Sequence, residues 1–204
     1  MNILAIGGHP DDIEYGCGGT LLQAARKGHR VYLFVATEGG EGGDGQTRRR
    51  EQERAAELLG VERITWGGYR DTEVPMDKGL ISKIEAVVKD VQPGVIFCHS
   101  ATDTHQDHRT LCAATISAAR HAQNLLLYEG PSTYDFCPTV YSDIGDVLEA
   151  KLELLRAYES QVDKTGIKNL NITAMANSNA NFRGIQARVK YAEGFLPVRL
   201  MLDV

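Results

Sequence analysis

The chain alternates short apolar runs with longer segments whose apolar residues recur at helical spacing. Runs of this length, rich in β-branched residues, predict strands, and the longer segments predict amphipathic helices. The predicted strands cover residues 2–7, 31–37, 63–67, 94–99, 125–129 and 139–143. The predicted helices cover residues 18–27, 48–59, 78–91, 107–123, 146–158 and 179–191.

Strand–helix alternation of this kind is typical of an α/β fold with a mostly parallel sheet between two layers of helices. The strands at 2–7 and 94–99 are almost continuously apolar, as strands buried on both faces should be. Gly28 and Gly60 follow two of the predicted helices, at the position where a helix commonly ends. No change in composition divides the chain, so we expect residues 1–204 to form one domain.

Composition and charge exclude several classes of partner. The chain has 22 basic and 27 acidic residues, and its net charge of −5 offers no general attraction to nucleic acid or to an anionic membrane. No apolar stretch approaches the roughly 20 residues that span a bilayer. The apolar N-terminal run lacks a basic region, so it predicts a strand and not a signal peptide. These features favour a cytoplasmic protein.

Two clusters of imidazole and carboxylate side chains each follow an apolar run directly. The first is His-Pro-Asp-Asp at positions 9–12, and the second is His-Gln-Asp-His at positions 105–108. Open α/β folds bind their ligands at the carboxyl ends of the strands. Two such clusters in one small protein therefore predict a single mononuclear metal site.

A catalytic zinc site uses three protein ligands and one water. Pro10 stiffens the first loop, and a turn there lets positions 9 and 12 converge, so His9 and Asp12 are the predicted pair. Either His105 or His108 completes the set, and the spacing does not decide between them. A remaining carboxylate beside the metal can accept a proton from its water, and a second imidazole can stabilise charge on the substrate.

Taken singly, each cluster has a simpler interpretation. The first could be a tight turn in which Asp11 or Asp12 caps the following helix, and the second a polar loop with Asp107 as an N-cap. Six metal-competent side chains behind two apolar strands make a shared site the better interpretation.

The glycine-rich segments do not predict a nucleotide site. Residues 38–47 hold five glycines, but no lysine completes a phosphate-binding loop, so we expect a mobile loop at the rim of a site. Gly7-Gly8 and the glycines of residues 16–19 have the wrong spacing for a dinucleotide turn. The two carboxylates at positions 11 and 12 would also repel a pyrophosphate, which excludes NAD there.

The remaining polar and sulfur-containing residues have structural interpretations. At least two of the three arginines at 48–50 are expected to be solvated. His29 and His121 are predicted on the surface, and His99 is interpreted as a packed residue at the end of its strand. The cysteines show no paired spacing, so we expect buried, small apolar side chains at positions 17, 98, 112 and 137.

Taken together, these residues resemble the PIG-L/LmbE-type zinc-dependent N-deacetylases over most of the chain. Residues 9–12 are similar to the opening HPDD motif of that family. Residues 105–109 resemble its HPDHR motif, with glutamine in place of the usual proline. Supporting similarities lie at residues 37–40, 48–61, 160–161 and 191–195.

The resemblance implies a Rossmann-like three-layer sandwich that hydrolyses the N-acetyl group of a small molecule containing N-acetylglucosamine. It also implies a zinc ion on His9, Asp12 and His108, with iron(II) as an alternative metal. Asp11 would be the general base that deprotonates the zinc-bound water and later protonates the leaving amine. Related proteins often form homo-oligomers, so we expect one here.

The resemblance implies roles for four further residues. His105, oriented by Asp107, would stabilise the oxyanion as an imidazolium. Arg48 and Asp71 would hold hydroxyl groups or a carboxylate of the substrate.

Two other functions fit the same residues. An amidase acting on a sugar–thiol conjugate would keep the site and change the bond that is cleaved. A ligand-binding α/β module without catalysis would need no metal, since one fold serves many functions.

Overall fold

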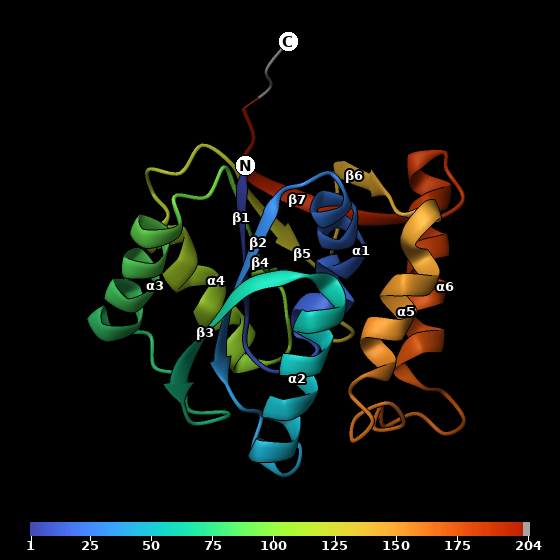
Figure 1. The fold of residues 1–204 in the computed structure, drawn as a ribbon, viewed down its shortest axis with the longest axis horizontal. Helices are drawn as coiled ribbons and strands as arrows, with labels where there is room; N and C mark the ends of the chain where they lie inside the picture. The colour runs from blue at the N-terminus through green and yellow to red at the C-terminus, as the bar shows by residue number, and fades with distance from the viewer. Residues whose placement is uncertain (202–204) are drawn as a thin grey trace.

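Strand β4 (Val95–His99) is the middle strand of a seven-stranded sheet with the order β3-β2-β1-β4-β5-β7-β6, and β1 (Asn2–Gly7) lies next to it (Figure 1). This computed structural model describes residues 1–201, so the last three residues of the predicted domain lie outside the described part. The elements are β1 (Asn2–Gly7), α1 (Asp12–Arg26), β2 (Arg30–Thr37), α2 (Gly45–Leu59), β3 (Val61–Tyr69), α3 (Lys78–Val91), β4 (Val95–His99), α4 (Gln106–Ala118), β5 (Leu125–Tyr128), β6 (Val140–Asp143), the 3₁₀ helix η1 (Gly145–Val147), α5 (Leu148–Arg156), α6 (Ile172–Ala187) and β7 (Ala192–Arg199).

The sheet is mostly parallel, as the sequence predicts. Strands β1 to β5 pair in parallel, and β7 runs antiparallel to both β5 and β6. The sequence did not predict β7. Gly194 and Pro197 interrupt its apolar pattern, because glycine packs no side chain and proline donates no hydrogen bond to a neighbouring strand.

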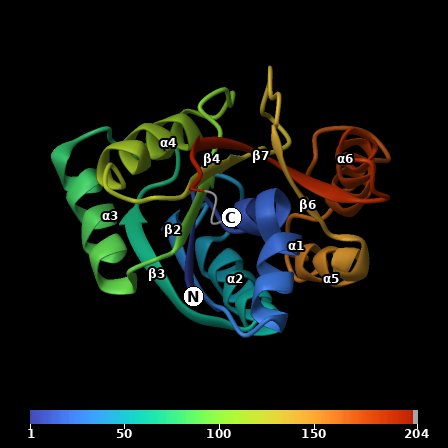
Figure 2. The ribbon, with the colours of Figure 1, turned by 90° about the horizontal axis from the view of Figure 1, so that it is seen from above.

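Successive side chains of β1 enter two separate cores on opposite faces of the sheet. Ile3 and Ala5 pack with residues of α1, α2, α5 and α6. Leu4 and Ile6 pack with residues of α3 and α4. Figure 2 shows the same division, with α3 and α4 on one side of the sheet and α1, α2 and α5 on the other. The three-layer α/β fold is therefore confirmed, and its strand alternation explains the unbroken apolar run of β1.

Helix α1 begins six residues before the predicted start at position 18. The glycines near its N-terminal end resemble a loop in the sequence, but they are packing positions in the structure. A Cβ atom on Gly16 would lie 2.1 Å from the ring of Tyr128, and one on Gly19 would lie 2.8 Å from Ile144. The glycines thus let α1 approach β5, which brings its first turn close to the end of the sheet.

A buried ion pair forms hydrogen bonds with backbone groups in the middle of α1. The Glu193 carboxylate accepts hydrogen bonds from the backbone N–H groups of Gly19 and Thr20, both at 2.8 Å. The Lys151 ammonium donates to Glu193 and to the carbonyl oxygen of Tyr15, both at 2.6 Å. Both charged side chains are less than 5% exposed. Strand β7 and helix α5 are thereby fixed to the middle of α1.

Two further expectations concern cysteines and membrane segments. Cys17, Cys98 and Cys112 are buried, as predicted, but Cys137 is exposed because it lies in the loop between β5 and β6. Across residues 1–201, none of the helices has the length and apolar character that crossing a bilayer requires.

Candidate metal centre

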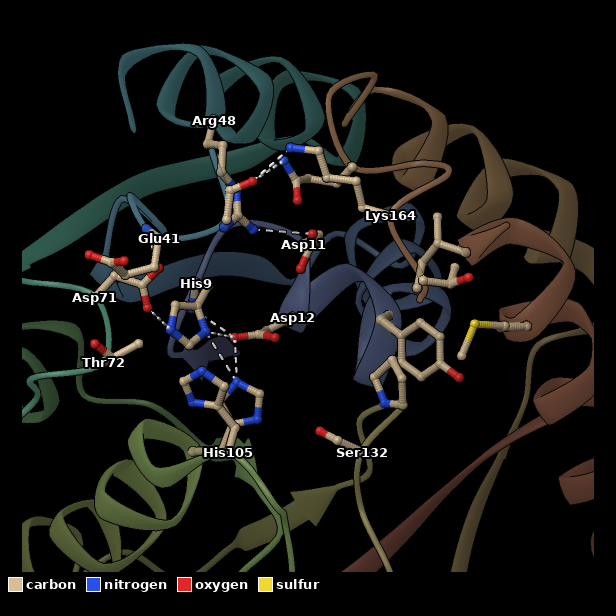
Figure 3. Close-up of a pocket in the computed structure, with 18 residues that line it drawn as sticks. His9, Asp11, Asp12, Glu41, Arg48, Asp71, Thr72, His105, Ser132 and Lys164 are labelled. Atoms are coloured by element: carbon tan, nitrogen blue, oxygen red, sulfur yellow. Dashed lines mark hydrogen bonds and ion pairs between the residues drawn. The ribbon is translucent and has the colours of Figure 1, made fainter. Parts of the chain in front are cut away.

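The two predicted clusters meet at the carboxyl end of the sheet. β1 and β4 are neighbouring parallel strands, so the loops that follow them leave the same edge side by side. Residues 9–12 lead into α1, and residues 105–108 form the start of α4. Figure 3 shows His9, Asp12 and His105 directed toward one another from these two loops.

Three potential ligand atoms form an almost equilateral triangle. His9 Nδ1 lies 3.2 Å from Asp12 Oδ2 and 3.2 Å from His108 Nε2. The third edge, from His108 Nε2 to Asp12 Oδ2, is also 3.2 Å. For metal–ligand bonds of about 2.1 Å, ligand atoms at octahedral to tetrahedral angles lie roughly 3.0–3.4 Å apart. The triangle therefore fits one divalent ion.

The other nitrogen of each of these histidines faces a carboxylate. His9 Nε2 lies 2.9 Å from Asp71 Oδ1, and His108 Nδ1 lies 3.3 Å from Asp103 Oδ1. Carboxylates in this position fix the tautomer and the ring orientation of metal-binding histidines. Burial opposes protonation of His108, but Asp12 and Asp103 outweigh it and raise its pKa to about 9. This excess of negative charge around both rings favours a bound cation.

Asp12 supplies the third atom of the triangle as a carboxylate. Burial opposes its ionisation, but contacts with His108, His99 and His9 hold its pKa well below the ordinary value. Asp12 Oδ2 also accepts the backbone N–H of His9 at 2.7 Å, which closes the turn predicted for this loop.

Asp103 is a site residue that our sequence analysis missed. It is fully buried, and its Oδ1 accepts the His105 backbone N–H and the Ser132 hydroxyl, both at 2.8 Å. Its Oδ2 accepts the Thr133 hydroxyl at 2.8 Å. The signal was an aspartate two residues before the second cluster, in a polar stretch that follows a buried strand.

His99 also contacts the site, so packing alone does not describe it. Its Nε2 accepts the Gly8 backbone N–H at 3.0 Å and lies 3.3 Å from Asp12 Oδ2. Its ring stacks on His108 with centroids 3.8 Å apart. Burial and the neighbouring His108 lower the pKa of His99 to about 4, so this ring is a neutral support behind the triangle.

Asp11 lines the pocket beside the triangle in a strained conformation. Its φ of 92° lies in the left-handed region, which residues with a side chain rarely adopt outside functional sites. Burial and the charge of Asp12 raise the pKa of Asp11 to about 7, although Arg48 opposes this shift. Its side chain does not cap α1, contrary to one of the simpler interpretations of this loop.

Arg48 joins the loop after β1 to the glycine-rich loop. Its guanidinium donates to the carbonyl oxygens of Pro10 and Gly39, at 2.8 and 2.9 Å, and lies 3.3 Å from Asp11. Arg48 is buried, whereas Arg49 and Arg50 are partly or fully exposed, so two solvated arginines are confirmed. The substrate-binding role predicted for Arg48 stays a prediction.

His105 and Asp107 interact differently from the expectation. His105 caps α4, and its Nδ1 accepts the backbone N–H of Asp107 at 3.2 Å. The Asp107 carboxylate instead accepts the Thr72 N–H at 2.8 Å and lies 3.3 Å from His9 Nε2. The N-cap is therefore His105 and not Asp107, and the backbone of Asp107 orients the ring.

The hydrogen bond at Nδ1 places the proton of a neutral His105 on Nε2. Burial and the nearby His9 and His108 lower the pKa of His105. Both observations favour a neutral N–H donor over the imidazolium that the resemblance implies.

Asp71 links the glycine-rich loop to the triangle. Its Oδ1 faces His9, and its Oδ2 accepts the Glu41 backbone N–H at 2.9 Å (Figure 3). Contacts with His9 overcome burial and lower the pKa of Asp71 to about 2, so it stays ionised. This geometry favours a role in positioning His9, and the predicted contact with substrate stays a prediction.

A cavity of about 460 Å³ opens beside the triangle. The glycine-rich loop and the segment after α5 form part of its rim, where Lys164 Nζ donates to the Gly42 carbonyl oxygen at 2.7 Å. Ser160 donates its N–H and hydroxyl to Glu51, both at 2.7 Å. Two segments that resemble family motifs in the sequence thus contact each other and hold the rim.

The pocket is lined by His9, Asp11, Asp12, Tyr15, Glu41, Gly42, Arg48, Asp71, Thr72, His105, His108, Pro131, Ser132, Gln161, Lys164, Thr165, Ile172 and Met175.

Comparisons with known proteins find related sequences. The family model described as PIG-L, GlcNAc-PI de-N-acetylase, matches residues 4–119, a range that contains both clusters. The uncharacterized deacetylase YaiS of Escherichia coli is 35% identical over 167 residues, which cover 78% of this chain and 90% of that protein. Diacetylchitobiose deacetylase of Thermococcus kodakarensis is 30% identical over 185 residues, covering 78% and 69%.

Solved structures share the fold. The N,N'-diacetylchitobiose deacetylase of Pyrococcus horikoshii, determined with an inhibitor, superposes with a TM-score of 0.86 and 28% identity. The match covers 97% of this chain and 83% of that one.

Proposed function

We propose that this chain, which belongs to the PIG-L family of deacetylases, hydrolyses the N-acetyl group of a small molecule containing N-acetylglucosamine. The main observation behind this proposal is the triangle formed by His9 Nδ1, Asp12 Oδ2 and His108 Nε2. Asp11 and His105 line the same pocket. Relatives named as deacetylases favour this enzyme over a ligand-binding module without catalysis.

His9, Asp12 and His108 would hold one divalent ion. Two imidazoles and one carboxylate suit zinc and leave room for a water, and iron(II) is accepted by similar ligands. When bound, the ion lowers the pKa of a water and polarises the amide carbonyl.

Asp11 is the proposed general base. It removes a proton from the attacking water as the new C–O bond forms, and it delivers that proton to the amine nitrogen as the C–N bond breaks. The products are acetate and a free amine. A base with a pKa near 7 suits this double role, because it both accepts and returns a proton at neutral pH.

His105 is the proposed donor to the oxyanion. Its Nδ1 is occupied by the Asp107 N–H, so Nε2 carries the hydrogen available to the substrate. A donor whose ring is already fixed by the helix start stabilises developing charge without having to reorganise. Arg48 and Asp71 support this arrangement by holding the loops that carry Asp11 and His9.

The test is amine release from N-acetylglucosamine by the purified chain, measured with an amine-reactive dye. Activity should disappear with a chelator and return with zinc. Asp11→Asn should lower kcat by at least about 100-fold while metal content is unchanged. The control Asp146→Asn changes an exposed aspartate outside the pocket and should behave as wild type. Full activity of Asp11→Asn with metal bound would refute the proposed mechanism.

Two expectations from the sequence stay predictions. Size-exclusion chromatography with light scattering checks the homo-oligomer, and cell fractionation checks the cytoplasmic location.

A further inference from the structure

The pocket has two chemically different ends. Around the triangle, imidazoles and carboxylates line it almost continuously. Elsewhere four residues with apolar surfaces line the same cavity, namely Tyr15, Pro131, Ile172 and Met175. Hydrolysis of an acetamide needs only the polar end, so the apolar wall requires a separate explanation.

Three separate elements build this apolar wall. Tyr15 comes from the first turns of α1, and Pro131 from the loop after β5. Ile172 and Met175 stand three residues apart at the start of α6, so their side chains share one face of that helix. In Figure 3 the neighbouring Ser132 and Lys164 lie on the side of the pocket away from Asp71 and Thr72.

Three of the four wall residues belong to the packed body of the protein, whereas Pro131 is exposed. Tyr15 is 7% exposed and is part of the core cluster beneath α1, and the half-buried Ile172 and Met175 pack against that cluster. Side chains anchored in this way keep their shape when a ligand is absent. A preformed apolar surface binds an apolar group without first paying the entropy of ordering.

The charged residues of the pocket do not favour an anionic substituent. Asp11, Glu41 and Asp71 line the cavity with Asp12. The Arg48 guanidinium donates to two carbonyl oxygens and pairs with Asp11, and the Lys164 ammonium donates to Gly42. With a divalent ion on the triangle, these two cations balance the four carboxylates of the pocket, so its charge offers an acidic group no net attraction.

We propose that the apolar wall is a subsite for a neutral alkyl or aryl group attached to the amino sugar. The inference rests on the proposed function, because it assigns the acetamide to the triangle and the substituent to the wall. The substrate is then an amphipathic glycoside, with its N-acetyl sugar at the metal and its apolar group against Tyr15, Ile172 and Met175.

A second sugar fits the wall less well than an apolar group. Sugars stack on aromatic rings and need hydrogen-bond partners for their hydroxyl groups. Tyr15 has a flat ring, but Ile172 and Met175 carry no strong hydrogen-bonding group, so this part of the wall leaves sugar hydroxyl groups without partners. Each methylene buried against such a surface strengthens binding by about fourfold, so a short alkyl chain suffices for strong discrimination.

The experiment compares four substrates at saturating zinc: N-acetylglucosamine, its hexyl glycosides in both anomers, and di-N-acetylchitobiose. The variant is the double substitution Ile172→Ala with Met175→Ala. The control is Ile185→Ala, an exposed isoleucine on the same helix outside the pocket. Calorimetric binding of the hexyl glycosides to metal-free protein gives a readout independent of turnover.

We expect kcat/KM for one hexyl glycoside to exceed that for N-acetylglucosamine by about tenfold or more, chiefly through KM. The double variant should lose this preference and the calorimetric binding, because the alkyl group then has no wall to pack against. Ile185→Ala should keep the preference.

Equal kcat/KM for the free and hexyl sugars in wild type overturns the inference and leaves the proposed function intact. A preference for di-N-acetylchitobiose, or a hexyl preference that survives in the double variant, overturns it as well. Absence of amine release from all four substrates overturns the proposed function itself.

Discussion

The buried carboxylate of Asp103 offers the sharpest test of how the metal centre is supported. Asp103→Asn keeps the volume of the side chain but replaces one acceptor oxygen with a donor and removes the charge that faces His108 Nδ1 at 3.3 Å. Loss of such a carboxylate behind a metal-binding histidine typically weakens metal binding by about 10- to 100-fold, or roughly 1.4–2.7 kcal/mol. Because Asp103 is fully buried, solvent does not screen this interaction.

The same substitution also removes a hydrogen bond. An asparagine whose oxygen keeps the bonds from His105 N–H and Ser132 turns its NH₂ group toward Thr133 Oγ1, which already accepts the Gly130 N–H. We expect a loss of stability of about 1 kcal/mol in the metal-free protein.

Thr133→Val separates the two effects. It removes the bond to Asp103 Oδ2 but leaves the oxygen that faces His108. Metal dissociation constants come from competition with a chromophoric chelator, and stability from urea unfolding without metal. We expect both variants to lose stability, but only Asp103→Asn to lose metal affinity. A dissociation constant for Asp103→Asn within twofold of wild type would refute the reasoning.

The remaining predictions concern catalysis, metal removal and the fold. Asp11→Asn should lower kcat by about 100- to 10,000-fold at unchanged metal content, measured by amine release. In wild type, kcat/KM should rise with pH through about 7, because Asp11 acts as a base only after losing its proton; a profile flat across that range contradicts the assignment. Zinc at about 100 times its dissociation constant should stabilise the protein by about 2.7 kcal/mol in thermal unfolding, an effect that chelation removes. Lys151→Met leaves the Glu193 carboxylate buried without its cation and should cost about 3 kcal/mol in urea unfolding, whereas Arg156→Met, which breaks exposed pairs, should cost less than about 1 kcal/mol.

The sequence predicted the site best where metal-binding residue types directly follow a predicted strand. The two His/Asp clusters each follow a buried strand, and parallel neighbouring strands bring them together. Spacing left open whether His105 or His108 faces the ion. In the fold, the Asp107 N–H occupies Nδ1 of His105, while Nε2 of His108 completes the triangle.

The contacts by which two aspartates position the histidines could not be predicted, because tertiary structure defines them. Asp71 reaches His9 from the end of β3, and Asp103 is fixed by hydroxyl groups from the loop after β5. Only the resemblance pointed to Asp71, and the local signal for Asp103 was its position two residues before the second cluster. The start of α6 was missed because its early turns contain Thr173, Asn177 and Ser178, whose weak helix propensity obscures the periodicity.

The insertion of Glu193 into α1 has a consequence for biosynthesis. The loop that bears His9 is synthesised well before β7, yet the helix behind it donates two of its central N–H groups to a carboxylate of that strand. A nascent chain that stops before β7 leaves Lys151 with no anion in the interior and the N–H groups of Gly19 and Thr20 without their acceptor. Helix α1 is therefore complete only once β7 is in place, and truncation of the chain before residue 193 should yield a protein that aggregates or is degraded.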